Sequence, residues 1–177
     1  MNEKEKAKKI LKILNKIYPT TPIPLDHTSN FTLLMSVLLS AQCTDLNVNN
    51  VTKGIYPKYN KPEHFLKLGR KRIEKLIKSI GLFRVKAKSV YLMSKQLLEK
   101  HGGEVPKSFE ALEKLPGVGH KTASVVMSQG FGVPAFAVDT HIHRLAQRWG
   151  LTNGKNVIQT EKDLKRIFPE KTWSKLH

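Results

Sequence analysis

Apolar residues recur at three- and four-residue spacing along nearly the whole chain, which is the periodicity of amphipathic helices. No alternation of apolar and polar residues continues for more than a few positions, so the pattern does not predict a β-sheet. The segment 31–41 is apolar on all sides, which is typical of a helix at the centre of a core. We therefore predict an all-α fold with short loops, its helices covering residues 3–17, 31–41, 46–56, 62–68, 70–80, 85–100, 108–113, 120–131, 139–149 and 157–168.

Residues at the ends of these segments support the boundaries. Prolines between residues 19 and 24 stop the first helix and make an extended connection. Gly102 and Gly103 end the long helix before them. A side-chain oxygen just before an apolar segment caps a helix by accepting backbone N–H bonds. On this basis we expect the capping residues to be Asn30, Asp45, Ser108 and Asp139.

The strongest local motif is the segment Leu115–Ala123, with the sequence Leu-Pro-Gly-Val-Gly-His-Lys-Thr-Ala. Its glycines permit a tight turn and a close approach of the backbone to an external group. The helix that follows presents N–H groups and the positive end of its dipole, a geometry that binds phosphate. Such a site would hold a duplex backbone without reading its bases. A plain helix-turn-helix with a glycine-containing turn is the alternative explanation.

Two polar side chains close to this motif are candidates for chemistry. Lys121 lies in the first turn of the helix, where the dipole disfavours a cation, so helix stability does not explain it. It is either a nucleophilic amine or a phosphate-binding cation. Asp139 follows after one helix and a loop that contains Pro134, so the returning chain could bring it near Lys121 across a groove. Helix capping also explains Asp139, and both roles can hold because a capping carboxylate is fixed in place.

The histidines and the cysteine do not predict a metal site. His141 and His143 are two positions apart on a helix, so their side chains diverge and cannot share one ion with Asp139. Cys43 is the only cysteine, which excludes an internal disulfide and fits a reducing compartment.

The chain is strongly basic, with 31 Lys or Arg against 14 Asp or Glu and a formal net charge of +17. Such a field attracts polyanions, so nucleic acid is the first candidate partner and an anionic membrane surface the second. A lysine-rich surface that only maintains solubility is the third explanation. The sequence contains no run of about 18 apolar residues, the length needed to cross a bilayer, and residues 1–12 lack the apolar core of a signal peptide. We expect a cytoplasmic protein, associated with the nucleoid if DNA is its partner.

Taken together, these motifs resemble endonuclease III, in the helix-hairpin-helix superfamily of DNA glycosylases. The matching segments occur in the family order and at its spacing, and they are Leu38–Asp45, Ile80–Ala87, Leu115–Ala123 and Val138–His141. The resemblance implies an all-α, two-lobed fold with a DNA groove between the lobes. One lobe would be residues 20–133, ending in the helix-hairpin-helix, and the other residues 1–19 plus 134–177. Lys121 and Asp139 would then face each other across the groove.

The resemblance also implies a role for each matching residue. Lys121 corresponds to the amine that attacks C1′ of the damaged nucleotide, and Asp139 to the carboxylate that assists attack and stabilises positive charge on the sugar. Gln42 corresponds to the side chain that fills the space left by the extruded base, and Leu82 to an apolar wedge that supports the opened duplex. Contacts with the DNA backbone are implied for Pro116, Gly117, Val118, Gly119 and His120. The implied protein is a monomeric glycosylase and abasic-site lyase for damaged double-stranded DNA, most of all oxidised pyrimidines.

The sequence differs from the family in one respect. Most endonuclease III proteins end in a four-cysteine loop that holds a [4Fe–4S] cluster, whereas Cys43 belongs to the first matching segment and no other cysteine is present. We therefore expect no cofactor and no metal in this chain. The sequence is either a fragment of a cluster-containing protein or a naturally cluster-free form, and its end at His177, about where the next family helix would begin, favours a fragment.

Three other functions remain open at this stage. A non-catalytic helix-hairpin-helix module that only binds DNA would share the charge and the hairpin, but it would not require Lys121, Asp139 and Gln42 together. A glycosylase for mispaired or oxidised purines would share the fold, because the base pocket cannot be identified in a single sequence. Binding to a membrane surface would require association with liposomes that DNA does not compete away.

Overall fold

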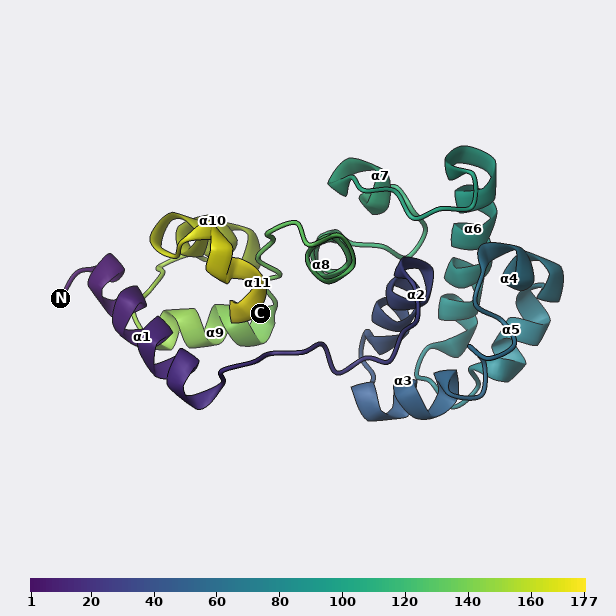
Figure 1. Ribbon diagram of the computed structural model, residues 1–177, viewed down its shortest axis with the longest axis horizontal. Coiled ribbons are helices and arrows are strands. Elements are labelled where there is room, and N and C mark those ends of the chain that lie inside the picture. Colours follow the sequence, from purple (N-terminus) through teal and green to yellow (C-terminus); the bar gives the residue numbers. More distant parts are fainter. The chain divides into compact units, whose positions relative to one another are not determined.

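The computed structural model describes residues 1–177, and all of its regular elements are helices (Figure 1). The predicted all-α fold is therefore confirmed. The chain forms two compact units, one of residues 23–131 and one of residues 1–22 together with 132–177. No helix has both the length and the apolar character needed to cross a bilayer.

The unit of residues 23–131 is built around α2 (Asn30–Ser40), whose residues from Phe31 to Leu39 are all buried. A helix that is apolar on every side has to be surrounded, and α3 (Asp45–Thr52) and α8 (His120–Val125) pack against it. On the other side of the unit, α4 (Pro62–Leu68) and α5 (Arg70–Leu76) lie along α6 (Phe83–His101) (Figure 1). The remaining helix, α7 (Phe109–Glu113), packs against α8.

The other unit consists of the two ends of the chain. It contains α1 (Glu3–Ile17), α9 (Thr140–Arg148), α10 (Val157–Ile167) and the short α11 (Trp173–Leu176), which follows a 3₁₀ turn at Glu170–Thr172. Ala7 on α1 is buried against apolar side chains from the loop before α9 and from α10. This small core consists of Ala7, Phe136, Val138, Ala146, Leu151, Leu164, Ile167 and Phe168.

Two of the expected capping residues are wrong by one position. Ser29 caps α2, because its Oγ accepts a bond from Thr32 N at 3.1 Å while Thr32 Oγ1 accepts one from Ser29 N at 2.9 Å. Thr44 caps α3 by accepting a bond from Asn47 N at 3.2 Å. A capping residue needs extended backbone angles, which Ser29 and Thr44 have, whereas Asn30 and Asp45 already belong to the helices. The expected caps at Ser108 and Asp139 are confirmed.

Several helix ends also differ from the prediction. The helices predicted over 46–56 and 70–80 end earlier, at Thr52 and Leu76, because the apolar residues beyond them are buried outside a helix. The helix predicted over 120–131 changes after Val125 into a π-helical turn, Val126–Gly130. This wider turn packs Gly130 against α2, where an added Cβ would lie 2.8 Å from the side-chain oxygen of Asn30.

Candidate functional site

The hairpin between α7 and α8 depends on Gly117. This residue has a left-handed backbone, with φ 77°. A Cβ at this position would lie 2.8 Å from Cβ of Ser89 on α6 and 3.1 Å from Cδ1 of Leu38 on α2. Both the angle and the lack of space require glycine here. The backbone of the turn therefore lies directly on the two longest helices of its unit.

Buried side chains and backbone bonds fix the rest of the turn. Leu115 is 2% exposed and Val118 is 6% exposed, so both side chains point into the unit. Val118 N donates to Leu115 O at 3.1 Å, and Gln96 Nε2 on α6 donates to the carbonyl of Lys114 at 3.2 Å. The turn is held firmly, because its start is bonded to α6, its own backbone closes it, and two of its side chains are buried.

The first turn of α8 has no side-chain cap. Gly119 is the capping position, and no protein atom lies within 4 Å of the place where its Cβ would be. Most helices fill this position with Ser, Thr, Asp or Asn, whose oxygen satisfies the first N–H groups. Glycine there leaves room for an oxygen from outside, and phosphate oxygens suit such a position.

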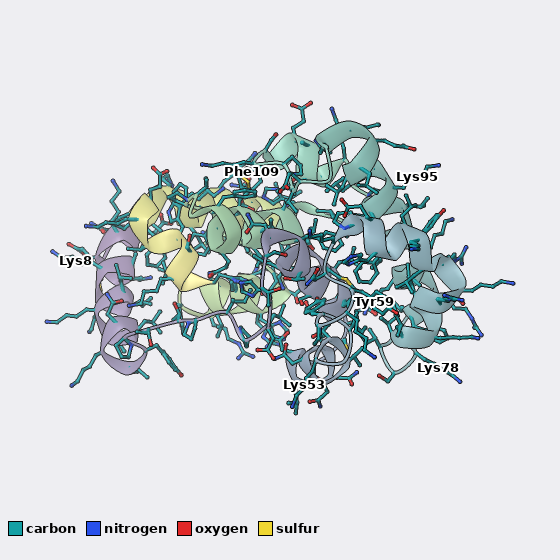
Figure 2. All side chains as sticks on the ribbon, turned by 45° about the vertical axis from the view of Figure 1, so that its right-hand side comes forward. Lys8, Lys53, Tyr59, Lys78, Lys95 and Phe109 are labelled. Carbon is teal, nitrogen blue, oxygen red and sulfur yellow. The ribbon has the colours of Figure 1, made fainter.

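His120 joins the two helices of the hairpin. Its Nδ1 lies 2.5 Å from Oε1 of Glu113, and its ring stacks on Phe109 with the ring centroids 5.9 Å apart. Phe109 is labelled in Figure 2, where it stands on α7. The His120 side chain thus has partners within the hairpin, whereas the DNA contact predicted for this residue uses its main chain.

Lys121 lies in the first turn of α8, directly after the hairpin, and its side chain is exposed. The rigid turn before it fixes where its Cα lies. The π-helical turn follows one helical turn later, and such turns are frequent at functional sites.

Asp139 is held in one orientation by the helix that it caps. Its Oδ1 accepts bonds from His141 N at 3.0 Å and from Ile142 N at 2.9 Å. Its Oδ2 lies 3.9 Å from Nδ1 of His141. The carboxylate thus keeps a fixed direction, as its capping bonds require.

The histidines of this region have other partners. Nδ1 of His143 lies 2.7 Å from Oγ1 of Thr160, which attaches α9 to α10. No group of three or more His, Cys, Asp or Glu side chains in residues 1–177 has a metal-binding arrangement.

Gln42 and Leu82 are the only residues other than glycine with positive φ, at 54° and 59°. Both residues are exposed, and Leu82 is 58% exposed although its side chain is apolar. A left-handed backbone is unfavourable for residues with a Cβ, and such conformations cluster at functional sites. Gln42 and Leu82, for which the resemblance implies roles in the opened duplex, thus share a backbone feature that the sequence pattern does not predict.

The structure also shows a residue that the sequence analysis did not assign. Lys86 on α6 is only 6% exposed, and its ammonium donates to the carbonyls of Leu39 at 2.9 Å and Ala41 at 2.6 Å. Lys86 lies four residues before Val90 and thus on the buried face of the helix. A charged residue on the apolar face of a predicted helix was the feature that could have identified it.

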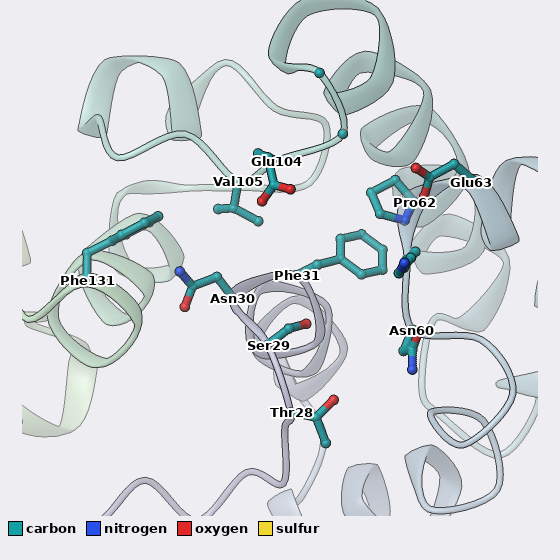
Figure 3. A pocket seen from close by; sticks show the side chains of 13 residues that line it. Thr28, Ser29, Asn30, Phe31, Asn60, Pro62, Glu63, Glu104, Val105 and Phe131 are labelled. Carbon is teal, nitrogen blue, oxygen red and sulfur yellow. The ribbon is translucent and has the colours of Figure 1, made fainter.

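The basic surface and the polar hollow of this unit carry different charges. Lysines project outward from many elements, among them Lys53, Lys78 and Lys95 in Figure 2. Figure 3 shows the hollow next to the start of α2, where Glu63 and Glu104 bring carboxylates. None of the predicted site residues lines it, and its carboxylates, Glu63 and Glu104, outnumber its one cation, Lys61, so the hollow does not favour a phosphate.

Comparisons with known proteins agree with this geometry. Residues 35–170 match the model of the HhH-GPD superfamily base excision DNA repair proteins. The chain is 47% identical to endonuclease III of Bacillus subtilis (strain 168) over 165 residues, which are 93% of this chain and 75% of the relative. The chain belongs to the endonuclease III family. It is a base-excision-repair DNA glycosylase of the HhH-GPD superfamily, and the enzyme class of its endonuclease III relatives is DNA glycosylase and abasic-site lyase.

Two further relatives support the family. Endonuclease III of Escherichia coli (strain K12) is 47% identical over 167 residues, 93% of this chain and 79% of the relative. A solved structure described as a trapped endonuclease III–DNA covalent intermediate, an estranged-adenine complex, superposes with a TM-score of 0.95 at 43% identity. The match covers 100% of this chain and 84% of the chain in that structure. The helix-hairpin-helix glycosylase fold expected from the sequence is therefore confirmed.

The residues of this chain do not fit the iron–sulfur cluster that is typical of the endonuclease III family. Such a cluster needs four ligands, normally cysteine thiolates, and Cys43 is the only cysteine among the 177 residues. Its sulfur accepts a bond from Nδ2 of Asn47 on α3 at 3.3 Å.

Proposed function

We propose that this protein is a bifunctional glycosylase and abasic-site lyase that removes oxidised pyrimidines from duplex DNA through a Schiff base on Lys121. The observation that carries the proposal is the position of Lys121, directly after a rigid glycine hairpin in a chain of the endonuclease III family. The covalent intermediate described for the related solved structure supports a mechanism of this kind.

The hairpin is the proposed grip on the DNA backbone. Pro116, Gly117 and Gly119 reach the surface next to the start of α8, which has no side-chain cap, and the main chain of the buried Val118 connects them. Because these contacts use the backbone, they would bind a phosphate in any sequence, as a repair enzyme that searches for damage requires. The net charge of +17 would add non-specific attraction.

Gln42 and Leu82 are proposed to enter the duplex when the damaged nucleotide leaves it. A base within a duplex is out of reach, so it has to be extruded, and a damaged base costs less to unpair. Leu82 would support the opened stack as an apolar wedge, and Gln42 would fill the space of the extruded base. Their exposure and left-handed backbones are consistent with side chains presented to a partner.

The chemistry follows from what a lysine amine can do. The nitrogen of Lys121 forms a bond to C1′ while the damaged base leaves with the bonding electron pair and takes up a proton. The sugar ring opens to a protonated imine, which acidifies the C2′ proton. Loss of that proton breaks the bond between C3′ and the 3′ phosphate oxygen, and water then hydrolyses the imine and releases Lys121. Asp139 would assist the attack and stabilise the positive charge on the sugar.

The test is borohydride trapping on a duplex that contains one abasic site. Borohydride reduces the imine to a stable amine, so the wild-type protein should become covalently attached to DNA and Lys121→Ala should not. Lys114→Ala is the matched control, because Lys114 is an exposed lysine of the same hairpin whose ammonium pairs with Glu110 at 2.8 Å. A protein that is folded and binds the duplex but forms no adduct would be a non-catalytic DNA-binding module.

The choice of lesion is tested with the same adduct. Duplexes with an oxidised pyrimidine should be trapped, whereas duplexes with a mispaired adenine or an oxidised purine should not. The reverse preference would show that the enzyme is a purine glycosylase. We further propose that the protein acts in the cytoplasm on DNA of the nucleoid, that it is a monomer, and that this chain binds no cofactor.

A further inference from the structure

We propose that Lys86 is a positioning residue for base extrusion, because it ties the loop that carries Gln42 to the loop that carries Leu82 and holds both side chains ready to enter the duplex. This inference rests on the proposed function of Gln42 and Leu82. It assigns the positioning of both side chains to one buried lysine, Lys86.

Lys86 bonds to both loops at once. Its ammonium donates to the carbonyls of Leu39 and Ala41, at the end of α2 immediately before Gln42. Its backbone N–H donates to the carbonyl of Leu82 at 3.0 Å. A displacement of either loop would therefore break a bond of the same residue.

The two loops also touch each other directly. Asn47 Nδ2 on α3 donates to Ser79 O at 3.1 Å and to the sulfur of Cys43 at 3.3 Å, so it is a second bridge between the same two loops. A Cβ on Gly81 would lie 3.7 Å from the carbonyl oxygen of Gln42. Gln42 and Leu82 thus belong to one connected surface of the unit of residues 23–131.

Helix capping does not by itself explain a buried ammonium. The last carbonyls of a helix accept bonds readily from water or from a polar side chain, and a cation there is favourable but not required. Burial lowers the pKa of Lys86, with Cys43 acting in the opposite direction, so the ammonium is kept in an environment that disfavours its charge. An apolar side chain of the same length would fill the space without that penalty. We infer that Lys86 is needed for its donors, which reach the carbonyl of Leu39 in α2 and the carbonyl of Ala41 directly before Gln42.

The test compares two substrates in one protein sample. Lys86→Met keeps the length of the side chain and removes its donors. On a duplex with a paired oxidised pyrimidine, the single-turnover rate of excision should fall about tenfold or more, the loss expected for one charge-assisted hydrogen bond. Strand cutting at an abasic site in single-stranded DNA needs no extrusion, so its rate should change by less than about twofold. Lys88→Met, an exposed lysine of the same helix, should change neither rate.

A merely structural role predicts a different result. If Lys86→Met lowers the melting temperature but reduces both rates equally, or neither rate, Lys86 does not position the loops. If this variant does not fold, Asn47→Ala removes the second bridge, and it should show the same selective loss to a smaller extent. If Asn47→Ala lowers the rates on both substrates by the same factor, or lowers neither, the proposal would also be overturned.

Fluorescence of 2-aminopurine next to the lesion separates this proposal from the catalytic one. The signal rises when a neighbouring base is extruded and does not depend on the Schiff base. Wild-type protein that raises the signal without cutting would refute the Lys121 chemistry and leave the role of Lys86 testable by the same signal. Wild-type protein that cuts, together with Lys86→Met that raises the signal as fast as wild type, would refute only the role of Lys86.

Discussion

Replacement of Gly117 by alanine gives the most direct test of how the hairpin is built. Two effects add at this position. A Cβ in a left-handed conformation costs about 1–2 kcal/mol, and φ is 77° here. The same atom would lie 2.8 Å from Cβ of Ser89 and 3.1 Å from Cδ1 of Leu38, an overpacking that costs about 1–3 kcal/mol. We therefore expect Gly117→Ala to lower the free energy of unfolding by about 3 kcal/mol.

The assay is urea unfolding followed by circular dichroism, with Gly119→Ala as the control. Gly119 lies in the same turn, has φ −94° and has no atom within 4 Å of its missing Cβ, so Gly119→Ala should cost under about 1 kcal/mol. Ser89→Gly removes the nearest obstacle to the added Cβ. In that background the cost of Gly117→Ala should fall by at least about 1 kcal/mol, which a double-mutant cycle measures as a coupling energy. A cost of Gly117→Ala below about 1 kcal/mol, or no coupling with Ser89, would refute the packing argument.

Three further variants test the site. Lys121→Ala should abolish strand cutting but leave the affinity for a duplex with a stable abasic analogue nearly unchanged. Titrations at several salt concentrations should show that the salt dependence of binding changes by less than about one phosphate contact. A large loss of affinity would make Lys121 a phosphate contact instead. Asp139→Asn should slow single-turnover excision and lower the free energy of unfolding by no more than about 1 kcal/mol, since asparagine also caps helices; unchanged turnover would remove Asp139 from the mechanism. Leu82→Gly should leave the free energy of unfolding unchanged or raise it by up to about 1 kcal/mol, because glycine accepts φ 59° without strain. The variant should nevertheless excise a paired lesion more slowly than wild type. If its excision rate equals that of wild type, the wedge is not needed.

Most of the helices could be predicted from the sequence because their apolar faces are regular. The pattern that predicted the segment 3–17 gave α1 with the same bounds, and an unbroken apolar segment gave the buried α2. Capping was harder, because adjacent polar residues such as Ser29 and Asn30 are equally able to accept a bond. Which of them caps depends on where the extended backbone ends, and tertiary packing decides this position.

The candidate site was only partly accessible to sequence reasoning. The hairpin glycines and Lys121 are local, so their arrangement follows from a short segment of chain. The contact between Lys86 and the end of α2 joins residues that are 47 and 45 positions apart, and no local pattern contains it. The left-handed backbone angles of Gln42 and Leu82 likewise could not be predicted from the conformational preferences of these residue types, because both normally avoid such angles.

Among the residues with positive φ, Gly117 differs from Gln42 and Leu82 in a way that separates folding from function. At Gly117 the chain has the residue that best tolerates the angle, and the close contacts of its backbone explain why. At Gln42 and Leu82 the chain keeps side chains that the angle disfavours, and these side chains are exposed, so they gain little from burial in return. Folding alone would favour glycine at both positions. This difference supports the proposal that both side chains make contacts outside the folded chain, and that a buried lysine bonded to both loops keeps them where such contacts can form.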